Sequence, residues 1–295
     1  MNADQISSQL KYLACNGVTL NPSELMNVKL GLEELQCLVG FEELKFWGKI
    51  EGKWRSVTEC SNLLGCLTDY FIATGISYLG HTGFCKKEFF WCSGENYKFS
   101  KLPDPLTGCK AVFDHIQTSF TGEFDKVVVS AHGVSEQAFI PKEVLATTPI
   151  PMRGLTELDR LSFVVQQIEH DCQIVPKGAL KMTPLNELRK NEAFRGLKLD
   201  QASKVENYYH FRAPVLKKNV ELNQMREGVY NNDFLDNASE DLPAHHWSVH
   251  KDTLGSLAVL RSKLWAGFYA YHKVNSSIFG ALYVGTGCKN RDAPF

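Results

Sequence analysis

The sequence predicts an α+β fold, with an N-terminal helical hairpin followed by a mostly antiparallel β-sheet body and a long central helix. Three observations predict it. Apolar residues recur at helical spacing in residues 1–40, aromatic-rich segments with strand periodicity follow, and a capped amphipathic helix lies near the middle. Because helices and strands do not alternate regularly, a doubly wound parallel sheet is disfavoured. We therefore expect an N-terminal helical segment, residues 1–40, and a single α+β domain, residues 41–295.

The N-terminal segment has the pattern of two antiparallel helices joined by a short loop. Ile6 and Leu13 share one face of the first helix. Asn21 is placed to cap the second helix, with Pro22 at its first position. An apolar stripe continues from there until Gly40 ends the helix.

Short segments rich in aromatic and β-branched residues predict the sheet. In residues 44–50, Leu44, Phe46 and Ile50 alternate with the residues between them, a period of two. The turn-forming residues 275–277 and the glycines after residue 284 separate or end the last strands. The predicted strands are residues 44–50, 69–73, 88–92, 126–131, 257–260, 268–271 and 279–284.

The central helix has the clearest signals in the chain. Thr156 stands three residues before Asp159 in the manner of a capping box. Apolar residues follow at spacings of three and four as far as Cys172, and Pro176 ends the helix. A shorter helix is expected from Asp200. Its predicted buried face holds Ala202, Val205 and Tyr209.

Composition narrows the class of protein. Apolar residues make up 44% and charged residues 22% of 295 positions, as in a globular chain that buries its own core. The formal net charge of −1 offers no basic excess for nucleic acid or an anionic membrane. No apolar run approaches the about 18 residues that a membrane span needs. Nine cysteines without a Cys-x-x-Cys pair predict reduced thiols that pack as small apolar residues.

The residues that superficially suggest catalysis have simpler interpretations. Gly285–Lys289 lacks the spacing of a phosphate-binding loop and a following helix. Ser130 and His132 have no carboxylate partner that the pattern identifies. His246 and His250 lie in a strand pattern, where such side chains are about 13 Å apart. We therefore predict no catalytic, cofactor-binding or metal-ligating residues, and the alternative is a soluble enzyme with a fold-assembled active site.

Clustered aromatic residues are more informative. They occur at Phe89-Phe90-Trp91, at Tyr208–Phe211 and at Phe268–Tyr271. Consecutive aromatic residues make both faces of a strand apolar, because neighbouring side chains point to opposite faces. One face packs on the core, and the other meets a second layer or a partner. Core packing is the default interpretation, but this feature favours an assembly subunit.

Several blocks, in order along residues 46–295, resemble the radial spoke head protein nine family. The closing block is the most distinctive of them. The blocks are Phe46–Ile50, Asp69–Ala73, Ile174–Leu180 with Thr183-Pro184, Tyr208–Val215, Trp247-Ser248, Val259–Ser262, Leu264–Gly267, and Tyr283–Asn290 with Asp292 and Pro294-Phe295. Three departures from the family pattern are an insertion-like stretch at 53–66, a poor match over 93–150, and Ala266 in place of an expected proline.

The resemblance implies a non-catalytic structural subunit of the radial spoke head in the axoneme of motile cilia and flagella, synthesised in the cytoplasm. It implies packing against the four-like and six-like head subunits and near the stalk subunit three. The head meets central-apparatus projections and passes mechanical signals toward the dynein arms. No cofactor, nucleic acid or membrane is implied.

A partner interface is predicted from residue type, because Trp and Arg dominate binding hot spots. The alternative interpretation for each residue is core packing or a local ion pair. The six candidates are Trp47, Trp91, Trp247, Trp265, Arg212 and Arg261.

Overall fold

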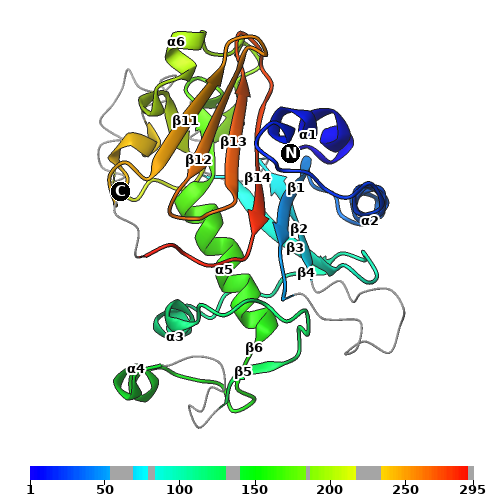
Figure 1. The fold of residues 1–295 in the computed structure, drawn as a ribbon, viewed down its shortest axis with the longest axis vertical. Coiled ribbons are helices and arrows are strands. Elements are labelled where there is room, and N and C mark those ends of the chain that lie inside the picture. The colour runs from blue at the N-terminus through cyan, green and yellow to red at the C-terminus, as the bar shows by residue number, and fades with distance from the viewer. Residues whose placement is uncertain (54–68, 79–83, 131–139, 184–186, 217–233, 292–295) are drawn as a thin grey trace.

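The computed structural model describes residues 1–53, 69–78, 84–130, 140–183, 187–216 and 234–291. The predicted insertion at 53–66 therefore lies outside the described residues except for Lys53, as do Pro184 and the end of the chain from residue 292. In the described part the fold is α+β, as predicted, and is built on one large sheet (Figure 1).

The large sheet contains eight strands that are mostly antiparallel. The exception is a short parallel pairing that joins Gly48–Ile50 to Tyr283–Gly285, which we call the seam. In spatial order the strands are β11 (Trp247–Asp252), β12 (Leu257–Ser262), β13 (Phe268–Lys273), β14 (Phe279–Gly285), β1 (Glu43–Ile50), β2 (Tyr70–Ser77), β3 (Lys86–Ser93) and β4 (Ser100–Lys101).

The remaining described elements surround this sheet. Three two-stranded pairs are β5 (Val127–Val129) with β6 (Leu155–Thr156), β7 (Ile174–Pro176) with β10 (Tyr208–His210), and β8 (Leu180–Met182) with β9 (Leu188–Lys190). The α-helices are α1 (Ile6–Ala14), α2 (Pro22–Leu38), α3 (Lys110–His115), α4 (Lys142–Thr147), α5 (Glu157–Cys172) and α6 (Leu199–Ala202). The 3₁₀ turns are η1 (Ala3–Gln5), η2 (Thr107–Cys109), η3 (Val205–Asn207) and η6 (Ala238–Glu240).

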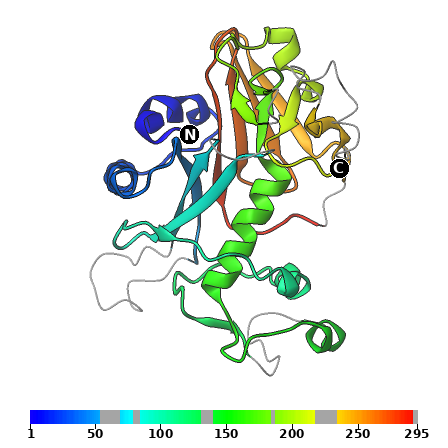
Figure 2. The same ribbon diagram turned by 180° about the vertical axis from the view of Figure 1, so that it is seen from behind.

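Both faces of the sheet are buried, which is the outcome that the clustered aromatics require. On β2, Tyr70 and Ile72 pack into the core cluster under α5, whereas Phe71 and Ala73 pack into the cluster under α1 and α2. This alternation follows from the two-residue period of a strand. The second layer over the aromatic face is thus provided by the chain itself (Figures 1 and 2).

The N-terminal helices form where the pattern predicts them. The side chain of Asn21 accepts from the Ser23 backbone N–H, and the Glu24 carboxylate accepts from the Asn21 backbone N–H. Pro22 begins the helix. Helix α1 packs on β13 and α2 packs on β1. The division after residue 40 stays a prediction, but the two helices share a hydrophobic core with the sheet.

Helix α5 lies on the opposite face and extends beyond the sheet (Figures 1 and 2). Its capping box is confirmed, because the Thr156 and Asp159 side chains each bond the backbone N–H of the other. Around its N-terminal half lie α3, α4, β5 and β6, which we call the lower lobe. The strand predicted at 126–131 forms as β5, which pairs with β6 outside the large sheet.

The helix expected from Asp200 is wrong beyond Ala202. The chain leaves α6 after this residue, and Tyr209 lies in β10, paired with Val175 of β7. Ala202 and Tyr209 are buried as predicted, but Val205 is only partly buried. Consecutive aromatic residues favour an extended chain, and their burial between two layers outweighs the weak helical pattern.

Candidate functional site

Carboxylates at both ends of α5 bind separate parts of the fold. At the N-terminal end, Glu157 is 2% exposed and accepts four short hydrogen bonds. The donors are the Tyr70 hydroxyl at 2.7 Å, the Thr121 amide at 2.9 Å, the Thr121 hydroxyl at 2.8 Å, and the Gly122 amide at 2.9 Å. A carboxylate at this position also interacts favourably with the helix dipole. Glu157 therefore connects the sheet, the helix and the loop at 121–122.

One turn further along α5, Arg160 connects the helix to the same loop region. Its guanidinium is 1% exposed, donates to the Thr118 carbonyl at 2.6 Å, and stands 4.3 Å from the centre of the Phe120 ring. A buried arginine needs such partners because removing its charge from water is costly.

At the C-terminal end of α5, Glu169 connects two strands of the sheet. The indole N–H of Trp47 on β1 donates to Oε2 at 2.9 Å, and the Lys87 ammonium on β3 donates to Oε1 at 2.6 Å. Lys87 also donates to the Phe211 carbonyl and lies 3.9 Å from the centre of that ring. Hydrogen bonds with a charged partner are the stronger class, so this junction is firmly held.

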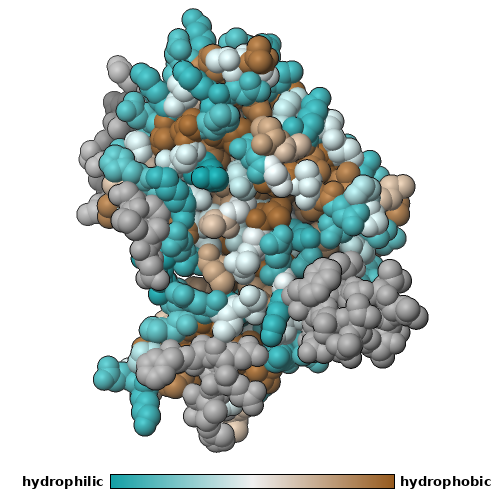
Figure 3. All heavy atoms as spheres, viewed as in Figure 1, coloured by the Kyte–Doolittle hydropathy of each residue, from teal (hydrophilic) through white to brown (hydrophobic). Residues whose placement is uncertain are grey.

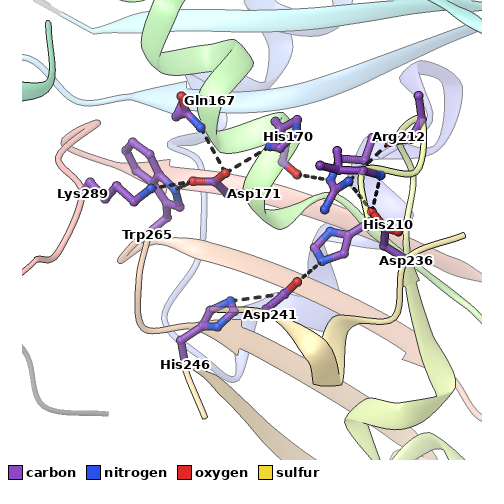
Figure 4. Close-up of polar contacts among 12 residues, drawn as sticks. Gln167, His170, Asp171, His210, Arg212, Asp236, Asp241, His246, Trp265 and Lys289 are labelled. Atoms are coloured by element: carbon purple, nitrogen blue, oxygen red, sulfur yellow. Dashed lines mark hydrogen bonds and ion pairs between the residues drawn. The ribbon is translucent and has the colours of Figure 1, made fainter. Parts of the chain in front are cut away.

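Asp171 makes a second junction two residues further along (Figure 4). Its Oδ2 accepts from Trp265 Nε1 at 3.0 Å and Lys289 Nζ at 2.9 Å, and Oδ1 lies 3.1 Å from Gln167 Nε2 and 3.2 Å from His170 Nδ1. Burial alone would raise the pKa of this carboxyl. The hydrogen bonds from His170 and Lys289, together with the Trp265 bond, outweigh burial and hold the pKa well below its ordinary value.

Asp241 accepts from a third indole, is hydrogen-bonded to the His210 imidazole and lies near His246 (Figure 4). Trp247 Nε1 donates to Oδ2 at 2.9 Å, and His210 Nε2 lies 2.7 Å from Oδ1. His246 Nε2 stands 3.6 Å from Oδ2, and its Nδ1 is 3.0 Å from the Pro243 carbonyl. Burial lowers the pKa of His246, so the ring is neutral at pH 7. Asp241 therefore connects β10 to the start of β11.

Arg212 belongs to an adjacent ion pair (Figure 4). Its Nη1 lies 2.6 Å from Asp236 Oδ2, and its Nε donates to the His170 carbonyl at 2.9 Å. The Val215 amide donates to the same Asp236 oxygen at 2.8 Å. Burial raises the pKa of Asp236, but the Val215 amide and Arg212 together lower it below its ordinary value. The pair fastens the strand-to-loop connection after β10 to the end of α5.

Three of the six predicted interface residues are buried in this chain. Trp47, Trp247 and Trp265 are 6%, 8% and 3% exposed. Each indole N–H donates to a carboxylate, to Glu169, Asp241 and Asp171 respectively. A buried tryptophan needs such a partner, which explains the pairing. Little of their surface is left for contact with another protein.

The other three candidates are placed nearer the surface. Trp91 on β3 is partly exposed and lies 5.3 Å, between ring centres, from Phe124 of the lower lobe. Arg212 is partly buried in its ion pair with Asp236. Arg261 is exposed on β12. The structure brings Arg212 and Trp265 to the same end of α5, and the partner interface itself stays a prediction.

Sequence reasoning missed the residues that bind these side chains. Glu157 and Asp171 have the appearance of solvated helix charges, and Asp241 lies in a loop without a motif. The sequence did contain a signal for Asp171. It lies beside the apolar stripe of an amphipathic helix and not at the centre of the polar face, which indicates partial burial. No comparable local signal marks Asp241. Its partner His210 is 31 residues away in sequence, and the nearby Trp247 and His246 form no recognisable motif with it.

A polar cleft of about 500 Å³ opens between the N-terminus and the segment around β9. Lys45 lies in it, and burial lowers the pKa of this lysine. Burial also lowers the pKa of the Met1 amine to about 4. The amine donates to the carbonyls of Phe46 at 2.9 Å and Ala281 at 3.2 Å. The Lys45 ammonium is 3.3 Å from a Glu43 carboxylate oxygen, so it is paired.

In the described part of the chain, the two histidines considered as a metal or catalytic pair do not lie together. His246 is buried beside Asp241, whereas His250 is exposed further along β11. His132 lies outside the described residues, so its pairing with Ser130 is not tested. Within the described residues, no three His, Cys, Asp or Glu side chains converge as metal ligands, and no helix is long and apolar enough to cross a bilayer.

The described part of the chain is an α+β body in which carboxylates at both ends of α5 bind separate parts of the fold. Comparison with known proteins gives the family. The radial spoke head protein 9 homolog of Danio rerio is 31% identical over 300 residues, covering 100% of this chain and 99% of the relative. Those of Bos taurus and Homo sapiens are each 29% identical over 299 residues, with the same coverage. No family model matches the chain. The chain belongs to the radial spoke head protein 9 family, which confirms the resemblance noted in its sequence.

Proposed function

We propose that this chain is a non-catalytic structural subunit of the radial spoke head in the axoneme of cilia and flagella. It contributes to assembly of the head, and it passes mechanical signals from central-apparatus projections toward the dynein arms. Family membership supports the spoke-head role. The structural observation that carries it is α5, whose buried side chains fasten the lower lobe and both parts of the sheet into one body.

Transmission of force requires a stiff body, and α5 has the length and the hydrogen bonds at both ends that stiffen this one. Its 16 residues span about 24 Å at about 1.5 Å per residue. Glu157 and Arg160 hold one end to the loop at 116–122, and Glu169 and Asp171 hold the other end to the sheet. Displacing the lower lobe therefore requires breaking charge-assisted hydrogen bonds as well as separating the apolar contact between α3 and α5.

The lower lobe also offers an apolar surface for a neighbouring subunit (Figure 3). Phe124, Val127 and Met152 are 46%, 49% and 98% exposed. Val127 lies against Gly154, in the turn that carries Met152, and Phe124 contacts the ring of Trp91. Exposed apolar side chains that gather in this way are typical of protein–protein contacts. We propose that this patch, together with Trp91, contacts a four-like or six-like head subunit.

Co-expression with four-like, six-like and stalk subunit three proteins tests the role and the patch together. The wild-type chain should co-purify with at least one head subunit. Phe124→Asp and Met152→Asp should weaken that binding by about tenfold or more, because each buries a charge at the contact. Leu254→Asp is the matched control, because Leu254 is 99% exposed in the β11–β12 turn. Equal binding by all three variants would remove the patch from the interface, whereas no binding by the wild type would contradict the structural role.

The lowered pKa of Lys45 in a polar cleft is an observation that favours the alternative, a soluble enzyme with a fold-assembled site. Its ammonium is already engaged by Glu43, which argues against a free nucleophile. Salt extraction of isolated axonemes separates the two functions. A scaffold stays with the spokes and is missing from spokeless cilia, whereas an enzyme is recovered mainly in the soluble fraction.

A further inference from the structure

Strands β14 and β1 separate beyond the seam, and the polar cleft lies in the opening. Their pairing covers only Gly48–Ile50 with Tyr283–Gly285. Before Tyr283, β14 remains paired with β13 on one side only. The cleft is lined there by Ser277–Ala281. Among the described residues, Phe279 and the Ala281 N–H therefore lack a strand partner on this side, whereas the Ala281 carbonyl accepts from the Met1 amine.

The ladder between β13 and β14 fixes which backbone groups face this opening. Lys273 donates to the Ile278 carbonyl at 2.9 Å, and Val284 donates to the Gly267 carbonyl at 2.9 Å. Antiparallel partners alternate between bonded and non-bonded pairs, so Phe279 and Ala281 direct their N–H and C=O groups away from β13. The bond from the Met1 amine to the Ala281 carbonyl confirms this orientation.

The walls of the cleft suit a peptide. On one side lie Asn2, which precedes η1, Gln5 of η1 and Gln9 of α1. Gln9 donates to Gln5 Oε1 at 2.7 Å and accepts from the Tyr271 hydroxyl at 2.8 Å. On the other side, Phe194 lies edge-on to Phe279 with ring centres 6.1 Å apart. Amide side chains can donate to and accept from a peptide backbone, and an aromatic pair can hold one apolar side chain.

A smaller hollow beside the cleft contains a polar group without a partner. This hollow shares the lining residues Met1, Lys45 and Ala281 with the cleft, and Thr74 lines it. The Thr74 residue is 4% exposed, and its hydroxyl makes no hydrogen bond among the residues that the structure describes. A buried hydroxyl of this kind is rare unless something else satisfies it.

We propose that this cleft binds an extended peptide segment of a partner spoke-head subunit, which adds to β14 as a further strand. The inference rests on the proposed function. The Phe279 carbonyl and the Ala281 N–H both face the cleft, so one residue of an extended peptide can donate to the first and accept from the second. One row of peptide side chains faces Phe194 and carries an apolar residue, and the other row faces the amides of Gln5 and Gln9.

A proline at Ala281 tests the inference directly. It removes the N–H that faces the cleft and places a ring there, without removing a bond to β13. The preceding residue is Gly280, which tolerates the restriction that proline imposes. Lys251→Pro is the matched control on the outer edge of the sheet. Lys263 donates to the His246 carbonyl at 2.8 Å, so Lys251 directs its N–H away from β12.

The experiment uses full-length chains co-expressed with the four-like or six-like subunit that binds the wild type. Hydrogen exchange should slow at residues 279–281 in the complex. Ala281→Pro should weaken the complex by about tenfold or more, which corresponds to one or two lost backbone bonds, whereas Lys251→Pro should not. Gln5→Trp, which fills the cleft from an exposed position on its wall, should have the same effect as Ala281→Pro and covers the case in which that variant misfolds.

The possible results distinguish failure of the peptide site from failure of the proposed structural role. Unchanged exchange at residues 279–281 in a complex that does form, or equal affinity of wild type and Gln5→Trp, overturns the peptide site and leaves the structural role intact. A wild-type chain that binds none of the head subunits overturns both.

Discussion

Replacing Asp171 by asparagine tests whether buried carboxylates hold α5 in place. The substitution keeps the shape of the side chain and one acceptor for the Trp265 indole. It removes the negative charge opposite Lys289, whose Nζ is 2.9 Å away, and it loses the second acceptor oxygen. The change is therefore confined to charge and hydrogen bonding.

The magnitude follows from how far the pair is removed from water. Hydrogen bonds to charged groups contribute about 1.5–3 kcal/mol, and breaking a fully buried ion pair costs about 3–5 kcal/mol. The Asp171 and Lys289 side chains are 16% and 30% exposed, so solvent screens part of the interaction. We expect the free energy of unfolding to fall by about 2 kcal/mol. At about 2–4 °C per kcal/mol for a large domain, Tm falls by about 4–8 °C.

The pH dependence has a definite sign. The pKa of Asp171 is lower in the folded chain than in the unfolded chain, because the hydrogen bonds and charges outweigh burial. Its contribution is therefore complete above the unfolded-state pKa, about 3.9, and is lost as pH falls through the lower folded-state pKa. The stability difference between wild type and Asp171→Asn should be constant from about pH 7 to 5 and should shrink below about pH 4.

Urea unfolding followed by tryptophan fluorescence at several pH values measures this difference. Asp114→Asn is the matched control, because Asp114 pairs with Arg291 at 3.0 Å while its side chain is 31% exposed. We expect that control to change stability by less than about 1 kcal/mol. Equal losses in the two variants, or an Asp171→Asn difference that does not shrink in acid, would refute the reasoning about α5.

Three further predictions concern the seam, the buried histidine and the lower lobe. Gly48→Ala places a Cβ 2.1 Å from the Tyr283 carbonyl oxygen and should cost about 3 kcal/mol in urea unfolding, whereas Gly40→Ala, with nothing within 4 Å, should be nearly neutral. Burial lowers the pKa of His272 from 6.5 to about 4, so wild-type stability should fall as pH drops from about 6.5 to 4. A His272→Gln variant should show a flatter profile over that range in the same assay. Glu157→Gln should lower Tm by about 4 °C or more and speed proteolysis of the 116–122 loop, since a weaker neutral acceptor replaces a charged one; unchanged cleavage would contradict that role.

Local pattern was sufficient for most of the elements. The capped starts of α2 and α5 and the strands β1, β2 and β3 were predicted, because each depends on residues a few positions apart. The helix expected from Asp200 ends at Ala202 and does not continue to Tyr209, because burial of Tyr208 and Tyr209 between layers decides that segment. Helices α3 and α4 were missed because each has only six residues, too few for a periodic signal.

The site was predicted less well than the fold, and the tryptophans show why. Residue type alone marks Trp47 and Trp265 as strong contacts, but it does not say whether the contact is inside the chain or with a partner. Their indoles donate to Glu169 and Asp171, residues more than ninety positions away from them in sequence. Pairings of this kind are set by the packed fold, so no window of sequence contains them.

Helix α5 and the cleft both lie at the junction between the two parts of the large sheet. Among the described residues, strands β1–β4 and β11–β14 pair directly through a three-residue parallel ladder, and the Met1 amine bonds the carbonyls of Phe46 and Ala281 on the two parts. Glu169 binds Trp47 on one of these parts, and Asp171 binds Trp265 beside the other, so the last turns of α5 bridge them. A strand added to β14 in the cleft would extend the bonded contact where the two parts separate. A partner that binds there would stiffen the same junction that α5 holds from the opposite end, and so couple assembly of the head to the rigidity that transmission of force requires.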